Sequence, residues 1–169
     1  MDDERLPKRV RDAPGAAELA AGLAERAEPL WTGGDSTAVR VPLAPGLEAA
    51  LKSAHSAGRI LRGLEGAERQ LATEQRGLEQ VDRSTGVDRG GRISRLIVLA
   101  DDGSERFYRS VHFLLRQHAP RLLALRLDLG EEGLGELLFG PGQVARLLLV
   151  QHKDAVSALL MALAEQFER

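Results

Sequence analysis

Leu96-Ile97-Val98-Leu99-Ala100 is a continuous apolar run near the middle of the chain, and it is the strongest indicator of the fold class. A run of this length without polar alternation is typical of a β-strand that is buried on both faces. Two further apolar runs follow it, at residues 122–127 and 144–150. The three runs predict the strands of a sheet that is covered on both sides.

Helical patterns lie between and after these three runs. Apolar residues recur at helical spacing after the turn at residues 101–104, and the pattern ends at Pro120. A short helix around residues 131–138 precedes the third strand, and a helix from His152 follows it. Such alternation produces a largely parallel sheet with helices on both faces. We therefore expect an α/β fold, a three-layer α/β/α sandwich with a small, largely parallel sheet of three or four strands.

The part of the chain before residue 94 divides at two prolines, Pro42 and Pro45. We place the main domain at residues 45–169, beginning with a helix that ends at Gly58 and a short extended segment at residues 59–62. Residues 1–44 are predicted to form an N-terminal extension. It would contain a charged, mobile tail over residues 1–14, a short helix within residues 15–30 and a strand over residues 37–41.

The helix that follows Gly63 has two faces of different chemistry. An apolar stripe runs along one side, formed by Leu64, Ala67, Leu71, Leu78 and Val81. Arginines repeat every seven residues, at Arg69, Arg76 and Arg83, and seven residues make about two turns. The leucines are therefore expected to pack inward and the three guanidinium groups to point outward. A basic, glycine-containing loop with Arg89 and Arg92 follows.

Four segments in this order resemble the kink-turn-binding ribosomal proteins of the archaeal L-seven-Ae and eukaryotic L-thirty-e type, a fold shared by the third domain of the eukaryotic peptide-chain release factor. Residues 51–63 resemble the first helix of that family and its short strand before a glycine. Residues 96–102 resemble its apolar strand with an acidic end. Residues 134–140, Leu-Gly-Glu-Leu-Leu-Phe-Gly, resemble its Leu-Gly…Gly helix, and residues 144–150 with the last helix resemble its end. The resemblance covers about residues 45–169.

The resemblance implies an RNA-binding site with two parts. RNA-binding members carry Gly-x-Asn-Glu-x-x-Lys at the start of the second helix, and the aligned residues here are Gly63, Leu64, Glu65, Gly66 and Arg69. The glycine and the positive charge match, whereas Glu65 replaces the asparagine and Gly66 replaces the glutamate that read base pairs. The second contact in the family comes from the loop that here contains Gly140 and Gly142. This chain also has an insertion at about residues 76–92.

Two kinds of binding protein follow from these features. The first is a non-catalytic RNA-binding or ribosome-associated protein that acts in translation and binds structured RNA or the ribosome. Arg69, Arg76 and Arg83 would then contact phosphates with help from Arg89 and Arg92. The alternative is a protein–protein interaction module of the same fold that has lost specific RNA recognition. The leucine stripe favours this alternative, because it extends further than the second helix of the family requires.

An enzyme is the third class, and the sequence offers little for it. Asp101 and Asp102 follow a strand, where α/β sheets often bind ligands, but a turn or a helix cap formed with Glu105 explains them as well. His112 and His118 are separated by about 240° on a helix, so they do not share one face. Glycine-rich nucleotide loops and a Gly-x-Ser-x-Gly sequence are absent. We therefore expect no enzymatic activity, no cofactor and no metal.

The composition is consistent with a globular protein and excludes cysteine chemistry. The 169 residues carry a formal net charge of −2, and 20 of the 23 basic residues are arginines. Because the chain has no cysteine, disulfides, thiolate metal sites and a cysteine nucleophile are excluded. The charged residues 1–5 predict no signal peptide, and no apolar run has the length of a membrane span. We expect a cytoplasmic protein without a membrane partner.

Overall fold

The computed structural model describes residues 1–85 and 91–169, with side chains described outside residues 82–90. The helices are η1 (Asp3–Arg5), α1 (Lys8–Arg11), α2 (Ala16–Glu25), α3 (Pro45–Ser56), α4 (Leu64–Thr85), α5 (Glu105–His118), α6 (Glu131–Phe139) and α7 (Lys153–Phe167). The strands are β1 (Ala27–Pro29), β2 (Thr37–Val41), β3 (Ile60–Arg62), β4 (Arg95–Leu99), β5 (Leu122–Leu127) and β6 (Leu147–Val150).

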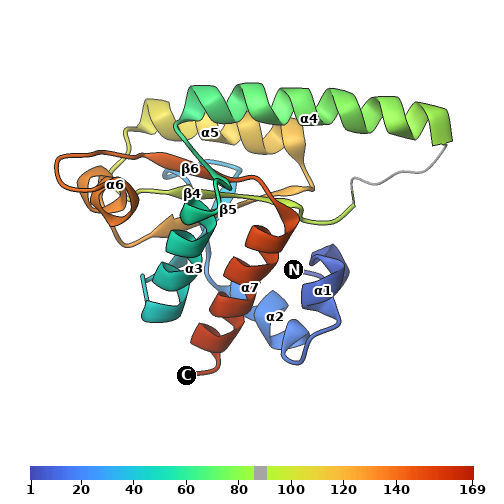
Figure 1. Ribbon diagram of the computed structural model, residues 1–169, viewed down its shortest axis with the longest axis horizontal. Helices are drawn as coiled ribbons and strands as arrows, with labels where there is room; N and C mark the ends of the chain where they lie inside the picture. The colour runs from blue at the N-terminus through green and yellow to red at the C-terminus, as the bar shows by residue number, and fades with distance from the viewer. Residues whose placement is uncertain (86–90) are drawn as a thin grey trace.

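The six strands form one mixed sheet in the order β1-β2-β5-β4-β6-β3. The central strands β2, β5 and β4 are parallel, whereas β1, β6 and β3 pair antiparallel with their neighbours. Helices α4 and α5 cover one face, and α1, α2, α3 and α7 cover the other (Figure 1). The predicted three-layer α/β architecture is confirmed, with six strands instead of three or four.

The alternating side chains of the central strands fill two cores. In β4, Leu96 and Val98 pack toward α3 and α7, whereas Ile97 and Leu99 pack toward α4 and α5. All four are buried, because helices lie on both sides of the sheet. This two-sided burial is the reason that the sequence of β4 lacks polar alternation.

Strand β6 runs antiparallel to β4 because α6 stays at one end of the sheet. The backbone N–H of Asp101 donates to Leu129 O at 2.8 Å, so the chain entering α6 lies beside the carboxyl end of β4. Helix α6 has only nine residues and does not return the chain to the opposite end (Figure 1). The following strand therefore starts at the end where β4 and β5 finish.

The N-terminal residues are part of the layered structure, and the predicted mobile tail over residues 1–14 is wrong. Leu6 and Val10 are buried in the same core as α7. They are four positions apart, so one side of this charged segment is anchored by apolar contacts. The predicted short helix and the strand over residues 37–41 correspond to α2 and β2, and β2 pairs with β5.

Candidate functional site

Gly63 connects β3 to α4 through a backbone conformation that favours glycine. Its φ is +103°, and its N–H donates to Leu147 O at 2.8 Å. A Cβ at this position would meet nothing within 4 Å, so the backbone angle and not crowding accounts for the glycine. Leu64 is half-buried and Glu65 is exposed. A Cβ on Gly66 would lie 3.3 Å from Leu61 Cδ2, so the first turn of α4 packs closely over β3.

The loop after α6 is built on two more glycines in the left-handed region. Gly140 and Gly142 have φ values of +95° and +79°. The N–H of Gly140 donates to Glu136 O, which ends α6, and the N–H of Gln143 donates to Gly140 O. These bonds fold residues 140–143 into a tight turn that leads into β6.

The structure brings this loop together with the end of β3. Arg62 Nη1 donates to Gln143 Oε1 at 3.2 Å, and the Arg62 guanidinium carbon lies 4.4 Å from the centre of the Phe139 ring. His55 packs edge-on against the same ring, with ring centres 4.9 Å apart. The two parts of the predicted site are therefore neighbours. Sequence reasoning did not assign Arg62 to the site, because its partner Gln143 is 81 positions away.

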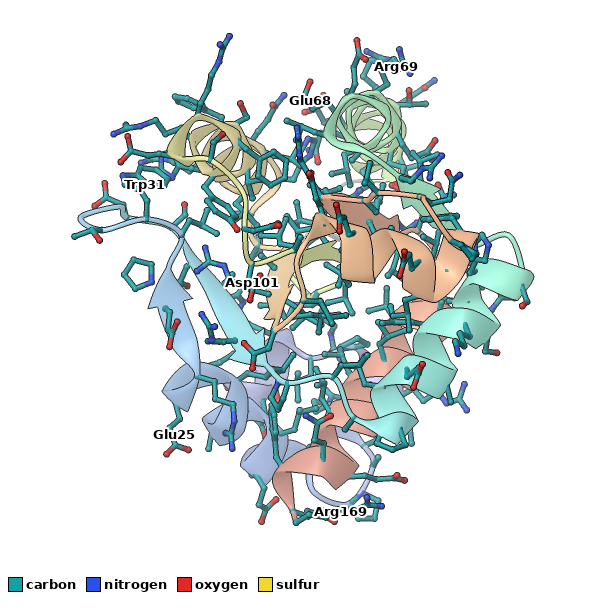
Figure 2. All side chains as sticks on the ribbon, turned by 90° about the vertical axis from the view of Figure 1, so that its left-hand side faces the viewer. Glu25, Trp31, Glu68, Arg69, Asp101 and Arg169 are labelled. Atoms are coloured by element: carbon teal, nitrogen blue, oxygen red, sulfur yellow. The ribbon has the colours of Figure 1, made fainter. Side chains whose placement is uncertain are left out.

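The arginines on α4 point away from the sheet. Ala67 and Leu71 are fully buried on the inner face of the helix, whereas Arg69 and Arg76 are exposed. Figure 2 shows Arg69 on the outer side of α4. Arg76 Nη2 donates to Thr73 Oγ1 at 3.3 Å, a contact within the same helix. The placement of Ala67 and Leu71 opposite these two arginines agrees with the heptad spacing, whereas Val81 at the end of the stripe is exposed and does not pack inward as predicted.

The predicted phosphate-binding residues do not all lie together. The side chain of Arg83 and the whole of Arg89 lie outside the described residues. Arg92 is half-buried and precedes β4, whereas Gly63 lies beside the carboxyl end of that strand. Because β4 spans five residues between these ends, Arg92 is not part of the surface formed by Gly63, Arg69 and the Gly140–Gly142 loop.

Helix α5 adds residues that the sequence reasoning missed. It lies beside α4, and a groove of about 320 Å³ between the helices is lined by Glu68, Arg69, Ala72, Ser110, Phe113, Leu114 and Gln117. Phe113 is 69% exposed. In the described part of α4 and α5, five arginines are exposed (Arg69, Arg76, Arg106, Arg109 and Arg116) against four glutamates (Glu65, Glu68, Glu79 and Glu105). The exposed side chains of this described part therefore carry one more positive than negative charge, on a chain with negative net charge.

The acidic pair at the end of β4 has a structural role in the turn. The N–H of Glu131 donates to Asp102 Oδ1 at 2.9 Å, so Asp102 caps the start of α6. The predicted capping box of Asp102 with Glu105 is wrong. Ser104 caps α5 instead, since its Oγ accepts the N–H of Phe107 at 3.1 Å. Asp102 is therefore engaged in holding α6 against β4.

The histidines are dispersed. Ser36 Oγ and His112 Nδ1 are 2.6 Å apart, and His118 is buried elsewhere on the same helix. Among the residues whose placement is described, no group of three or more histidine, aspartate or glutamate side chains is arranged to hold a metal ion.

Comparisons with known proteins find similarity among solved structures. No protein-family model and no curated protein matches the chain. The chain is similar to a solved structure described as a protein with unknown function from Bacillus halodurans, at 17% identity and a TM-score of 0.46. The similarity covers 73% of this chain and 99% of the other. Within the described residues, none of the helices combines the length and apolar character that a bilayer crossing requires.

Proposed function

We propose that this chain is a non-catalytic RNA-binding or ribosome-associated protein that acts in the cytoplasm in translation and is related to the kink-turn-binding ribosomal proteins. Its binding surface would consist of Gly63, Leu64, Glu65, Gly66, Arg69 and Arg76, together with Gly140 and Gly142. The observation that carries the proposal is the hydrogen bond between Arg62 and Gln143. It joins the start of α4 to the loop after α6, the two segments that contact RNA in the family.

The order of elements supports the same relationship. The four segments of the resemblance correspond to α3 with β3, to β4, to α6, and to β6 with α7. Each has the type of element that the resemblance requires. The glycine before α4 has a positive φ, and its position is open enough for the backbone to approach a ligand closely.

The chemistry of the surface favours contacts with the RNA backbone over base reading. Glu65 and Gly66 occupy the positions at which the family reads bases, and neither supplies a positive charge. Arg69 and Arg76 offer planar, exposed guanidinium groups that match phosphate geometry. Because phosphate contacts release counterions, the affinity should depend strongly on salt.

Fluorescence anisotropy of a labelled kink-turn hairpin, with an unrelated duplex beside it, tests this function. The double variant Arg69→Gln/Arg76→Gln should weaken binding and lower the slope of log affinity against log salt by about 1 for each arginine. The control variant Arg9→Gln/Lys52→Gln removes the same charge from exposed positions on α1 and α3 and should leave both quantities unchanged. Equal losses in the two variants, or no binding by the wild type, would contradict the proposal.

A protein–protein interaction module is the second candidate, and Phe113 favours it. Phe113 is 69% exposed beside the groove between α4 and α5, so its ring would be available to pack against an apolar side chain of another protein. If this function is correct, Phe113→Ser should abolish a protein complex, whereas Arg69→Gln/Arg76→Gln should leave the apolar contact largely intact. Retention of kink-turn binding in Phe113→Ser would favour the RNA function.

A further inference from the structure

A second cluster of basic residues lies at the other end of the sheet, where β4 and β5 begin and β6 ends. Arg95 at the start of β4 is aligned with Leu122 of β5, and Leu96 is aligned with Val150 of β6. Arg121 precedes β5, and Lys153 is the first residue of α7. None of these residues belongs to the proposed RNA-binding surface.

Two guanidinium groups in this cluster share one carboxylate. Arg95 Nε lies 2.7 Å from Glu74 Oε1, and Arg121 Nη2 lies 3.1 Å from Glu74 Oε2. The side chains of Arg121, Glu74 and Arg95 are only 7%, 14% and 19% exposed. Among the described side chains, one positive charge therefore remains without a compensating negative charge in a poorly solvated place, which is unfavourable.

Arg121 also has an unused donor. Its Nε is buried and has no hydrogen-bond partner among the described residues. Burial lowers the pKa of Arg121 below the ordinary arginine value, which is the direction expected for a cation that is incompletely compensated. Its neighbour His118 supplies no negative charge, and burial together with Arg121 lowers the pKa of that imidazole.

A pocket of about 380 Å³ opens beside this pair. It is lined by Leu78, Ser94, Arg95, Arg121, His152 and Lys153. Lys153 begins the 15-residue helix α7, so the positive end of the helix dipole also faces this region. The nearest acidic neighbour on α7 is Asp154, which lies beside His152 and does not line the pocket. The described lining residues thus include three cationic side chains and a hydroxyl group but no carboxylate.

Two more arginines make the same end of the sheet rich in donors. Arg5 Nη2 donates to Pro120 O at 3.0 Å, and the N–H of Ile93 donates to Arg5 O at 2.7 Å, which fixes Arg5 next to the start of β4. Arg5 Nε and Arg92 Nη1 are buried and lack hydrogen-bond partners among the described residues. At this end of the sheet, Arg121 Nε, Arg5 Nε and Arg92 Nη1 thus all lack an acceptor among the described residues.

We propose that this pocket binds a phosphate group, with Arg95, Arg121, Ser94 and Lys153 as its ligands. A phosphate dianion would supply the negative charge and the acceptor atoms that the cluster lacks, and arginine forks match its geometry. The source of the group is either free inorganic phosphate or the terminal phosphate of an oligonucleotide. The inference does not rest on the proposed RNA-binding surface, because none of the four phosphate ligands belongs to it, although Glu74 and Leu78 flank Arg76 on α4.

Isothermal titration calorimetry of the full chain with sodium phosphate, against sodium chloride at equal ionic strength, tests the site. Lys153→Gln removes an exposed ligand and should weaken phosphate binding about tenfold, which corresponds to one charge-assisted hydrogen bond. The matched control is Lys52→Gln on α3, which should bind like the wild type. Glu74→Gln removes the competing carboxylate and should bind phosphate more tightly than the wild type.

The opposite signs of these changes make the test decisive. A structural role of Glu74 alone gives no reason for tighter binding in a Glu74→Gln variant that circular dichroism shows to be folded. The proposal is overturned if the wild type gives no saturable heat with millimolar phosphate. It is also overturned if Lys52→Gln and Lys153→Gln weaken binding equally, or if folded Glu74→Gln binds more weakly.

A competition experiment distinguishes the two sources. A short 5′-phosphorylated oligoribonucleotide that displaces inorganic phosphate, while its 5′-hydroxyl counterpart does not, identifies a nucleotide phosphate as the ligand. If neither oligonucleotide displaces the phosphate, the site takes the free ion.

Discussion

A Cβ atom on Gly135 would lie 2.3 Å from the carbonyl oxygen of Gln143, so α6 contacts the backbone of its following loop directly. No side chain larger than hydrogen fits at residue 135 unless the loop moves. The neighbouring Gly133 is different, because a Cβ there would only approach the flexible side chain of Leu129 at 3.3 Å.

Gly135→Ala should therefore destabilise the protein by about 1–3 kcal/mol, the usual cost of overpacking, and displace the loop at residues 140–143. Gly133→Ala in the same helix should be neutral or slightly stabilising, because alanine is the better helix former. Urea unfolding measures both free energies. Equal destabilisation by the two variants would show that the contact of residue 135 with the loop does not account for the loss.

Tyr108 fixes the turn between β4 and α5. Its hydroxyl donates to Ala100 O at 2.7 Å and accepts the N–H of Gly103 at 3.1 Å. Tyr108→Phe keeps the ring but leaves a buried carbonyl and an amide without partners. We expect a loss of about 1–3 kcal/mol in the free energy of unfolding. An unchanged denaturation midpoint would mean that water replaces the hydroxyl without cost.

His118 should make the stability of the protein depend on pH. Burial and the charge of Arg121 lower its pKa below 6.5, whereas in the unfolded chain it titrates near 6.5. Above that value the imidazole is neutral in both states, and stability is unaffected. As the pH falls below it, the unfolded state takes up the proton first, so stability decreases.

His118→Leu removes this titration together with two ring nitrogens that lack partners among the described residues. The variant should lose less stability than the wild type between about pH 8 and about pH 5. Urea unfolding at both values measures the difference. Parallel losses in the two proteins would assign the acid sensitivity to other groups.

Leu6 gives the N-terminal segment a measurable contribution to stability. It is fully buried in the core that includes α7, so Leu6→Ala should cost about 2–5 kcal/mol. Arg9→Ala, three positions later and exposed, should change the free energy of unfolding by less than about 0.5 kcal/mol. Thermal and urea unfolding report both values. A small effect of Leu6→Ala would indicate that the first ten residues detach without loss of the core.

The sequence predicts best the features that depend on local periodicity. The apolar run at β4 indicated a buried central strand, and the heptad spacing of Arg69 and Arg76 placed both on the outer face of α4. These inferences hold because a helix or a strand repeats its geometry over a few residues.

Features that depend on distant partners could not be predicted in this way. Strand β1 has three exposed residues and no apolar pattern, so it is recognisable only from its pairing with β2. The contact of Glu74 with Arg121 spans 47 positions and arises only when α4 covers the sheet. Similarly, the arginines of α5 join those of α4 only because the two helices lie side by side.

Both outer strands of the sheet, β1 and β3, are three residues long. Strand β1 contains Pro29, which has no amide hydrogen, and Glu28, whose carboxylate lies 3.7 Å from Arg40. Short edges with proline and charged side chains resist pairing with strands of other chains. This architecture therefore disfavours assembly by β-strand addition. A macromolecular partner would instead have to recognise side chains on the helical layers or the loops at the ends of the sheet.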